Sequence, residues 1–139
     1  DIFTLQDLQG KEIGIQATTK PEEILIHHEE YGLPEVEKLY SFSNVNEIYG
    51  AMRKGYLDGI CGHESAMRSF IDTNPDAFRS LEENIYSSDL GVAFSKTYDS
   101  TFVKSLDKEL NSLKQDGTIR KIVEKYGLDA EYALGGIDD

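Results

Sequence analysis

Apolar and polar residues alternate along 11–16 (KEIGIQ), which is the pattern of a half-buried strand. Signals for a helix follow at once. Thr19 and Glu22 have the spacing of a capping box, and Pro21 stands in the first turn, where a helix tolerates proline. We therefore predict a strand at 11–16 and a helix over 20–31 that a glycine ends.

The rest of the chain continues this alternation of strand and helix signals and then turns helical. Periodicity, capping residues and breakers predict, in order, a strand at 36–42, a helix at 44–54, a strand at 57–61, a helix at 64–74, extended segments at 80–86 and 90–95, and helices at 102–116 and 119–126. The tail at 129–139 is predicted to fray. Because strands alternate with helices, right-handed crossovers would join parallel strands, and we predict an α/β fold.

Two turns of this predicted sheet lie where a strand ends and a helix begins, which is where α/β sheets bind ligands. Thr18 and Thr19 stand at the first helix start, whose free amides and positive dipole end favour a carboxylate. In the second turn, His63 and Glu64 could accept hydrogen bonds from an ammonium group. The plainer alternatives stay open: the threonines only cap their helix, and Glu64 only favours a helix N-terminus.

Composition narrows the classes of function. The 139 residues fit one domain, or one lobe of a larger one, and 14 Lys and Arg against 26 Asp and Glu give a net charge of −12, which disfavours nucleic-acid binding. The single cysteine, Cys61, can form neither an internal disulfide nor a multi-cysteine zinc site. His27, with Glu23 or Glu30, is better explained by a polar helix surface than by a metal site. No common catalytic motif is present, so we expect no enzyme, metal or cofactor.

Several segments, taken in order, resemble the family 3 extracellular solute-binding proteins. These are the polar amino-acid receptors of ABC transporters, and they are related to the ligand-binding domains of ionotropic glutamate receptors. The similar segments are 5–19 (LQDLQGKEIGIQATT), 51–58 (AMRKGYLD), 64–67 (ESAM), 90–96 (LGVAFSK) and 106–126, which contains DGTIRKIVEKY. The resemblance therefore covers most of the chain.

The resemblance implies a fold and a division of the chain. The fold would be one lobe of the type 2 periplasmic-binding-protein fold, a three-layer sheet with helices on both faces. Residues 1–88 would be the second lobe, and residues 89–139 the crossing strand and C-terminal helices that belong to the first lobe. Because most of the first lobe would be missing, we expect the isolated chain either to dimerise, through its exposed half-cleft or by exchanging its C-terminal helices, or to bind ligand very weakly.

The resemblance also implies a ligand site. Thr18 and Thr19 would bind the α-carboxylate of an amino acid, together with an arginine from the first lobe. The α-amino group would meet His63 if positions are counted from the preceding strand, or Glu64 if the ESAM segment is aligned, and both alternatives stay open. An alanine replaces the glycine that the family commonly has before its threonines.

The resemblance implies a periplasmic or extracellular solute-binding module that closes around an amino acid for ABC transport. Its partners would be the small-molecule ligand and a membrane permease or a signalling domain of the parent protein. The alternatives are a sensor domain of a membrane-bound signalling protein, a dehydratase-like enzyme in which His63 or Glu64 supplies a general acid, and a purely structural interaction domain.

Overall fold

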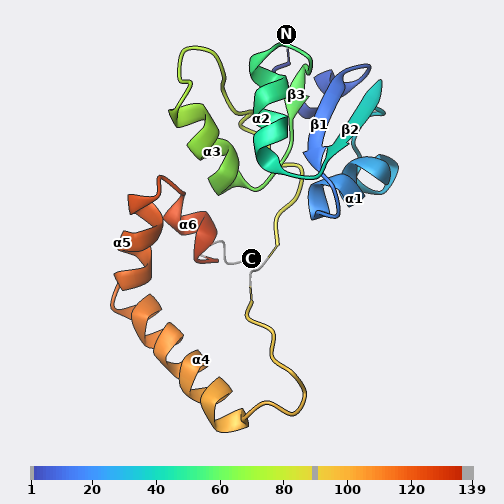
Figure 1. Ribbon diagram of the computed structural model, residues 1–139. Helices are drawn as coiled ribbons and strands as arrows, with labels where there is room; N and C mark the ends of the chain where they lie inside the picture. Colours follow the sequence, from blue (N-terminus) through green and yellow to red (C-terminus); the bar gives the residue numbers. More distant parts are fainter. Residues whose placement is uncertain (1, 89–90, 136–139) are drawn as a thin grey trace. The chain divides into compact units, whose positions relative to one another are not determined.

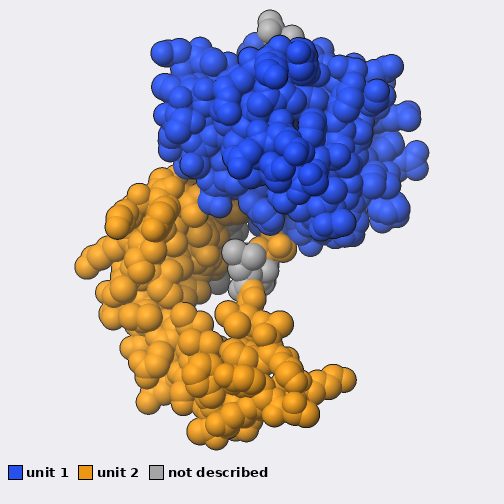
Figure 2. Space-filling model, viewed as in Figure 1, with its two compact units in different colours: residues 1–87 blue, residues 88–139 orange. Residues whose placement is uncertain are grey.

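The computed structural model describes residues 2–88 and 91–135. The chain divides into two compact units, Asp1–Ser87 and Ser88–Asp139, which are coloured separately in Figure 2. We call them unit 1 and unit 2. Unit 1 contains the strands of the described chain, whereas the regular elements of unit 2 are helices.

Unit 1 is a small parallel sheet with short helices (Figure 1). Its elements are, in order, the 3₁₀ helix η1 (Leu5–Leu8), β1 (Glu12–Gln16), α1 (Lys20–Ile26), the 3₁₀ helix η2 (His28–Tyr31), β2 (Lys38–Phe42), α2 (Val45–Arg53), β3 (Gly59–Ile60) and α3 (Glu64–Asp72). The strand order is β2-β1-β3, and both neighbouring pairs are parallel. The predicted α/β class, with a parallel sheet, is therefore confirmed.

β1 is the central strand, and helices cover it on both sides. Buried aliphatic side chains from β1, from α1 and from the segment before β2 form the core on one side: Ile13, Ile15, Ile24, Leu25 and Leu33. Gly14 points to the other side, where the buried Ile48 of α2 lies next to it. α1 and α2 thus lie on opposite sides of β1, as right-handed crossovers from β1 to β2 and from β2 to β3 require.

The packing over Gly14 leaves no room for a side chain. A Cβ atom added there would lie 2.6 Å from Cδ1 of Leu57 and 3.3 Å from Cγ2 of Ile48. Both neighbours are themselves buried, so neither can move freely into solvent. A glycine in the middle of the central strand is therefore what lets α2 approach the sheet.

Several boundaries in unit 1 differ from the prediction. The helix predicted over 20–31 is interrupted at His27, and its last turn tightens into η2, which brings Leu33 into the core. The strands predicted at 36–42 and 57–61 are shorter, at Lys38–Phe42 and Gly59–Ile60.

The segments predicted to be extended form no strand in the described residues 80–86 and 91–95, while Leu90 lies outside the described residues. Segment 80–86 is held by side chains instead of a strand ladder. Glu83 Oε2 accepts a hydrogen bond of 2.7 Å from the Leu5 N–H, and Ile85 packs on the core.

Unit 2 consists of α4 (Ser100–Gln115), α5 (Thr118–Lys125) and α6 (Ala130–Ala133). Gly117, with φ of 79°, separates the first two helices where the sequence predicts a break. The prediction that the tail frays is wrong for residues 130–133, which form the short helix α6. Oδ1 of Asp129 accepts hydrogen bonds from two amides and so caps this helix. Residues 136–139 of that tail lie outside the described residues.

Unit 2 buries little of its apolar surface. Ala130 is the one buried residue among its described residues. Apolar side chains of α4 and α5 are exposed, including Phe102 at 49% and Ile122 at 51%. A helical unit with so little buried surface requires further packing to be stable.

Replacing Gly14 with alanine should destabilise unit 1 by about 1–3 kcal/mol, because the new methyl group overpacks a closed site. The matched control is Gly50→Ala in α2, where an added Cβ meets nothing within 4 Å and alanine should stabilise by about 0.5–1 kcal/mol. Urea unfolding followed by circular dichroism measures both. Equal midpoints for the two variants would contradict the close packing at Gly14.

Candidate functional site

Two turns lie at the same edge of the sheet, because β1 and β3 are adjacent and parallel. The first turn follows β1 and is tied to the neighbouring strand by a 2.9 Å hydrogen bond from the Ala17 N–H to the Phe42 carbonyl. The second turn follows β3, and the Cys61 N–H donates to the Gly14 carbonyl at 3.0 Å. The carboxyl edge of the sheet is therefore where the residues expected to bind a ligand lie.

The hydroxyl groups of the first turn are both engaged with the backbone. Thr18 Oγ1 donates to the Ala17 carbonyl at 2.7 Å, and Thr19 Oγ1 donates to the Gln16 carbonyl at 2.6 Å. Thr18 also has φ of 61°, a left-handed conformation that is costly for a β-branched residue. Each hydroxyl would have to rotate before it could donate to a carboxylate.

The predicted capping box between Thr19 and Glu22 is wrong. Glu22 Oε2 accepts its 2.6 Å hydrogen bond from the Thr18 N–H, one residue earlier, while Glu22 Oε1 accepts from the Ser41 hydroxyl of β2. The Ser41 hydrogen bond first, and then that of Thr18, lower the pKa of Glu22 below its ordinary value of 4.5. The Thr18 amide, which the sequence predicted to be free for a ligand, therefore donates its hydrogen bond to the carboxylate of Glu22.

The next two amides of this turn, those of Thr19 and Lys20, donate to no described residue. The Lys20 ammonium donates to Glu23 Oε1 at 2.6 Å and to the Tyr31 hydroxyl at 3.1 Å, and it lies 5.4 Å from the ring centroid of Tyr86. The hydrogen bond to Glu23, followed by that to Tyr31, raises the pKa of Lys20. Lys20 is thus charged and held between a carboxylate and two aromatic rings.

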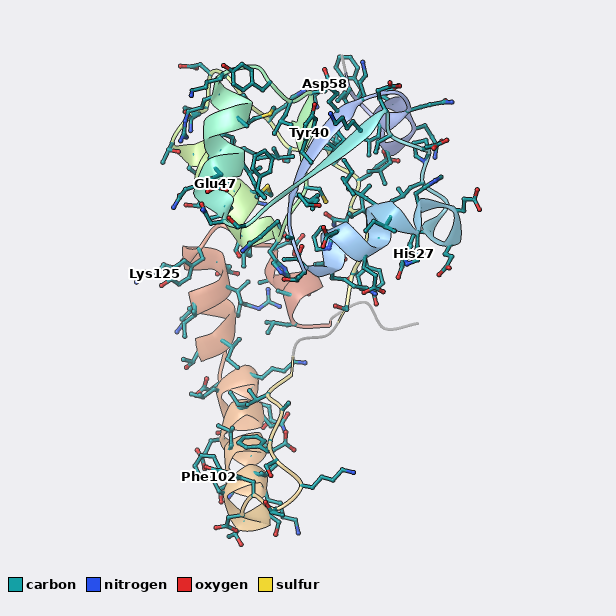
Figure 3. All side chains as sticks on the ribbon, turned by 45° about the vertical axis from the view of Figure 1, so that its right-hand side comes forward. His27, Tyr40, Glu47, Asp58, Phe102 and Lys125 are labelled. Atoms are coloured by element: carbon teal, nitrogen blue, oxygen red, sulfur yellow. The ribbon has the colours of Figure 1, made fainter. Side chains whose placement is uncertain are left out.

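A shallow hollow adjoins the first turn. Its lining comes from that turn and from α1: Thr18, Thr19, Lys20, Glu22, Glu23, Ile26 and His27. Figure 3 labels His27 at the end of α1. His63 and Glu64 do not line this hollow, so the structure brings the two pairs of predicted site residues to one edge but not into one pocket.

The second turn presents its two candidate residues differently. The exposed His63 is the N-cap residue of α3, and its side chain makes no cap hydrogen bond. Glu64 Oε1 instead accepts a 2.9 Å hydrogen bond from the guanidinium group of Arg68 on the same helix. The carboxylate is therefore engaged, while the imidazole of His63 has no hydrogen-bond partner among the described residues.

The described residues contain no cluster of three or more His, Cys, Asp or Glu side chains that could hold a metal ion. Burial raises the pKa of the half-buried Cys61 thiol to about 12, so its thiolate form is scarce at neutral pH. Within 2–88 and 91–135, no helix has the length and apolar character needed to cross a membrane.

Two contacts in this region could not be predicted from the sequence. Glu22 reaches Ser41, which lies 19 positions away, and Lys20 lies close to Tyr86, which comes near the end of unit 1. Neither pair follows from helix or strand periodicity. Only the spacing of Glu22 from the threonines hinted at a carboxylate near the turn.

No protein-family model matches the sequence. The chain is 27% identical over 128 residues to ABC transporter arginine-binding protein 1 of Escherichia coli K12, covering 88% of this chain and 50% of that protein. It is 23% identical over 126 residues to a protein of Campylobacter jejuni named "probable histidine-binding protein", covering 91% of this chain and 47% of that protein. The chain spans about half the length of these curated relatives.

Solved structures with a similar fold are also amino-acid-binding proteins. An ancestral arginine-binding protein bound to arginine superposes with a TM-score of 0.70 at 27% identity, covering 90% of this chain and 54% of that one. The fold is also similar to that of the substrate binding protein of an amino acid ABC transporter, with a TM-score of 0.65 at 23% identity, covering 90% of this chain and 54% of that one.

The relatives and the solved structures belong to one class of protein, to which this chain is similar. It is a partial match, about half in length, to the amino-acid-binding proteins of ABC transporters. The expected resemblance is therefore confirmed. The prediction that the chain is not an enzyme agrees with the relatives' descriptions, which are of binding proteins.

The lowered pKa of Glu22 predicts that the stability of the fold depends on pH through this residue. A depressed pKa in the folded state stabilises the fold above the ordinary value of 4.5, and this contribution is lost as the pH falls below it. Glu22→Gln should therefore lower the melting temperature at neutral pH. On acidification, the melting temperature of this variant should fall by less than that of the parent chain.

The matched control for this prediction is Glu37→Gln, which removes one exposed charge just before β2. Thermal unfolding at a series of pH values provides the comparison. Parallel pH profiles for the parent chain and Glu22→Gln would show that the Glu22 hydrogen bonds contribute nothing.

Proposed function

We propose that this chain is part of a periplasmic or extracellular solute-binding protein that binds an amino acid for ABC transport. The observation that carries this proposal is the likeness to an arginine-binding protein, which extends over 90% of the chain in both sequence and fold. The curated relatives are named for binding arginine and histidine, which supports an amino acid as the solute.

Residues 1–88 would form the second lobe of a type 2 periplasmic-binding-protein fold, with a three-layer arrangement of sheet and helices. Residues 89–139 would supply the crossing strand and C-terminal helices of the first lobe. The division of the chain between Ser87 and Ser88 supports this assignment. The exposed apolar residues of unit 2 support it too, because they require a packing surface outside that unit.

The proposed site lies at the carboxyl edge of the sheet. The α-carboxylate of the ligand would bind at Thr18 and Thr19, where the amides of Thr19 and Lys20 have no described partner. The α-amino group would be bound by His63 or Glu64. The pairing of Glu64 with Arg68 favours His63 for this role.

Ligand binding in such a protein would occur by closure of two lobes about a hinge, followed by delivery to a membrane permease. With one lobe only partly present, the isolated chain would hold the ligand on one side. Weak binding, or dimerisation through the exposed half-cleft or the C-terminal helices, would follow. No described residue favours the sensor or dehydratase alternative over transport.

Titration of the ¹⁵N-labelled chain with arginine tests the site. The amide signals of Thr19, Lys20 and His63 should shift with one binding curve, while that of Asp58, at the opposite edge of the sheet, should not. Shifts confined to other regions, or none at millimolar arginine, would overturn the proposed function.

Two variants decide which side chain holds the amino group. Loss of a hydrogen bond to a charged group costs about 1.5–3 kcal/mol, so the relevant variant should weaken binding about tenfold or more. We expect this loss for His63→Ala and not for Glu64→Gln. The reverse result would assign the amino group to Glu64.

A further inference from the structure

A carboxylate of the chain itself already lies on the turn after β1. Glu22 is in the first turn of α1, and its Oε2 atom accepts a 2.6 Å hydrogen bond from the Thr18 N–H. Its Oε1 atom accepts from the hydroxyl of Ser41 in β2, the strand next to β1. Glu22 also lines the hollow beside this turn. Its carboxylate therefore lies where the carboxylate of a ligand is proposed to bind.

The turn that Glu22 holds has a costly backbone conformation. Thr18 has φ of 61°, in the left-handed region that a β-branched residue rarely adopts. The hydroxyls of Thr18 and Thr19 donate to the carbonyls of Ala17 and Gln16, so neither is free to donate to a ligand. The Thr18 N–H gains a strong hydrogen bond in this conformation, because its acceptor is charged. The Glu22 carboxylate thus stabilises a closed form of the turn.

Only neutral groups hold the Glu22 carboxylate among the described residues. The Lys20 ammonium, which belongs to the same turn of α1, binds Glu23 and the Tyr31 hydroxyl instead. None of the ion pairs in the described part of the chain includes Glu22. Because its two donors belong to the exposed residues Thr18 and Ser41, water can replace them. The closed form of the turn can therefore open without leaving a charge buried.

We propose that Glu22 is an internal competitor for the ligand carboxylate, which closes the turn after β1 in the free chain and gives up the Thr18 amide when an amino acid binds. The inference rests on the proposed function. One carboxylate replaces another on the same amide, and the released Glu22 carboxylate is solvated by water. The ligand carboxylate then meets three successive amides, those of Thr18, Thr19 and Lys20, instead of two.

Competition of this kind weakens the apparent affinity. The apparent dissociation constant equals the intrinsic one divided by the fraction of molecules in which the turn is open. A substitution that destabilises the closed turn should therefore tighten binding, although it also destabilises the fold. The loss of a residue that only supports the site would weaken binding. The direction of the change distinguishes a competitor from a support.

Ser41→Ala tests the competition without changing any charge, because it removes one of the two hydrogen bonds to Glu22. The matched control is Ser43→Ala, which removes the same kind of group from Glu47, a residue that does not line the hollow. In NMR titrations, Ser41→Ala should bind arginine about threefold more tightly than the parent chain, and Ser43→Ala should bind it equally. Glu22→Gln should bind arginine about tenfold more tightly, despite its lower melting temperature at neutral pH.

Agmatine, which is arginine without its carboxylate, removes the exchange itself. Its affinity should not rise in Ser41→Ala or in Glu22→Gln. In the parent chain, the ¹³C signal of the Glu22 carboxyl group should shift when arginine is added and stay in place when agmatine is added.

Three results would overturn the competition alone. They are unchanged or weaker arginine binding in both variants, tighter binding in Glu22→Gln but not in Ser41→Ala, which the lost charge explains, and equal tightening for arginine and agmatine. In each of these cases arginine still binds at the amides of Thr19 and Lys20. Failure of arginine to bind the parent chain and both variants would overturn the proposed function as well.

Discussion

The close packing of β1 is the constraint on which the rest of unit 1 depends. Two buried isoleucines face α1, and Gly14 between them lets Ile48 and Leu57 approach the other side. Because β1 is covered on both sides and paired with a parallel strand on each flank, it fixes the direction of all three strands. This arrangement brings the turns after β1 and β3 to one edge.

The chemistry of that edge combines two opposite demands. The amides of Thr19 and Lys20 suit an anion, whereas the carboxylates of Glu22 and Glu47 suit a cation. Glu22 also stabilises the turn itself through Thr18, so the site and the fold share this residue.

Local patterns in the sequence predicted the elements well but not the contacts between distant residues. Asn44 caps α2 as its spacing from Glu47 suggested, and the glycine breaks of unit 2 fall where predicted. The role of Glu22 was misassigned, because its partner Ser41 lies on another strand and no local pattern reveals it. The segment 91–95 was expected to be extended, but the regular elements that the described part of unit 2 forms are helices, and none of them is a strand that could pair with it. Strands need a pairing partner, which short-range periodicity cannot supply.

The central claim is that the carboxyl edge of the sheet binds the α-carboxylate and α-amino groups of an amino acid. A crystal structure of the chain grown with arginine tests it most directly. We predict a ligand carboxylate within hydrogen-bonding distance of the Thr19 amide, with the ammonium group toward the turn after β3. Arginine bound elsewhere, with the turn after β1 closed by Glu22 and empty of ligand, would contradict it.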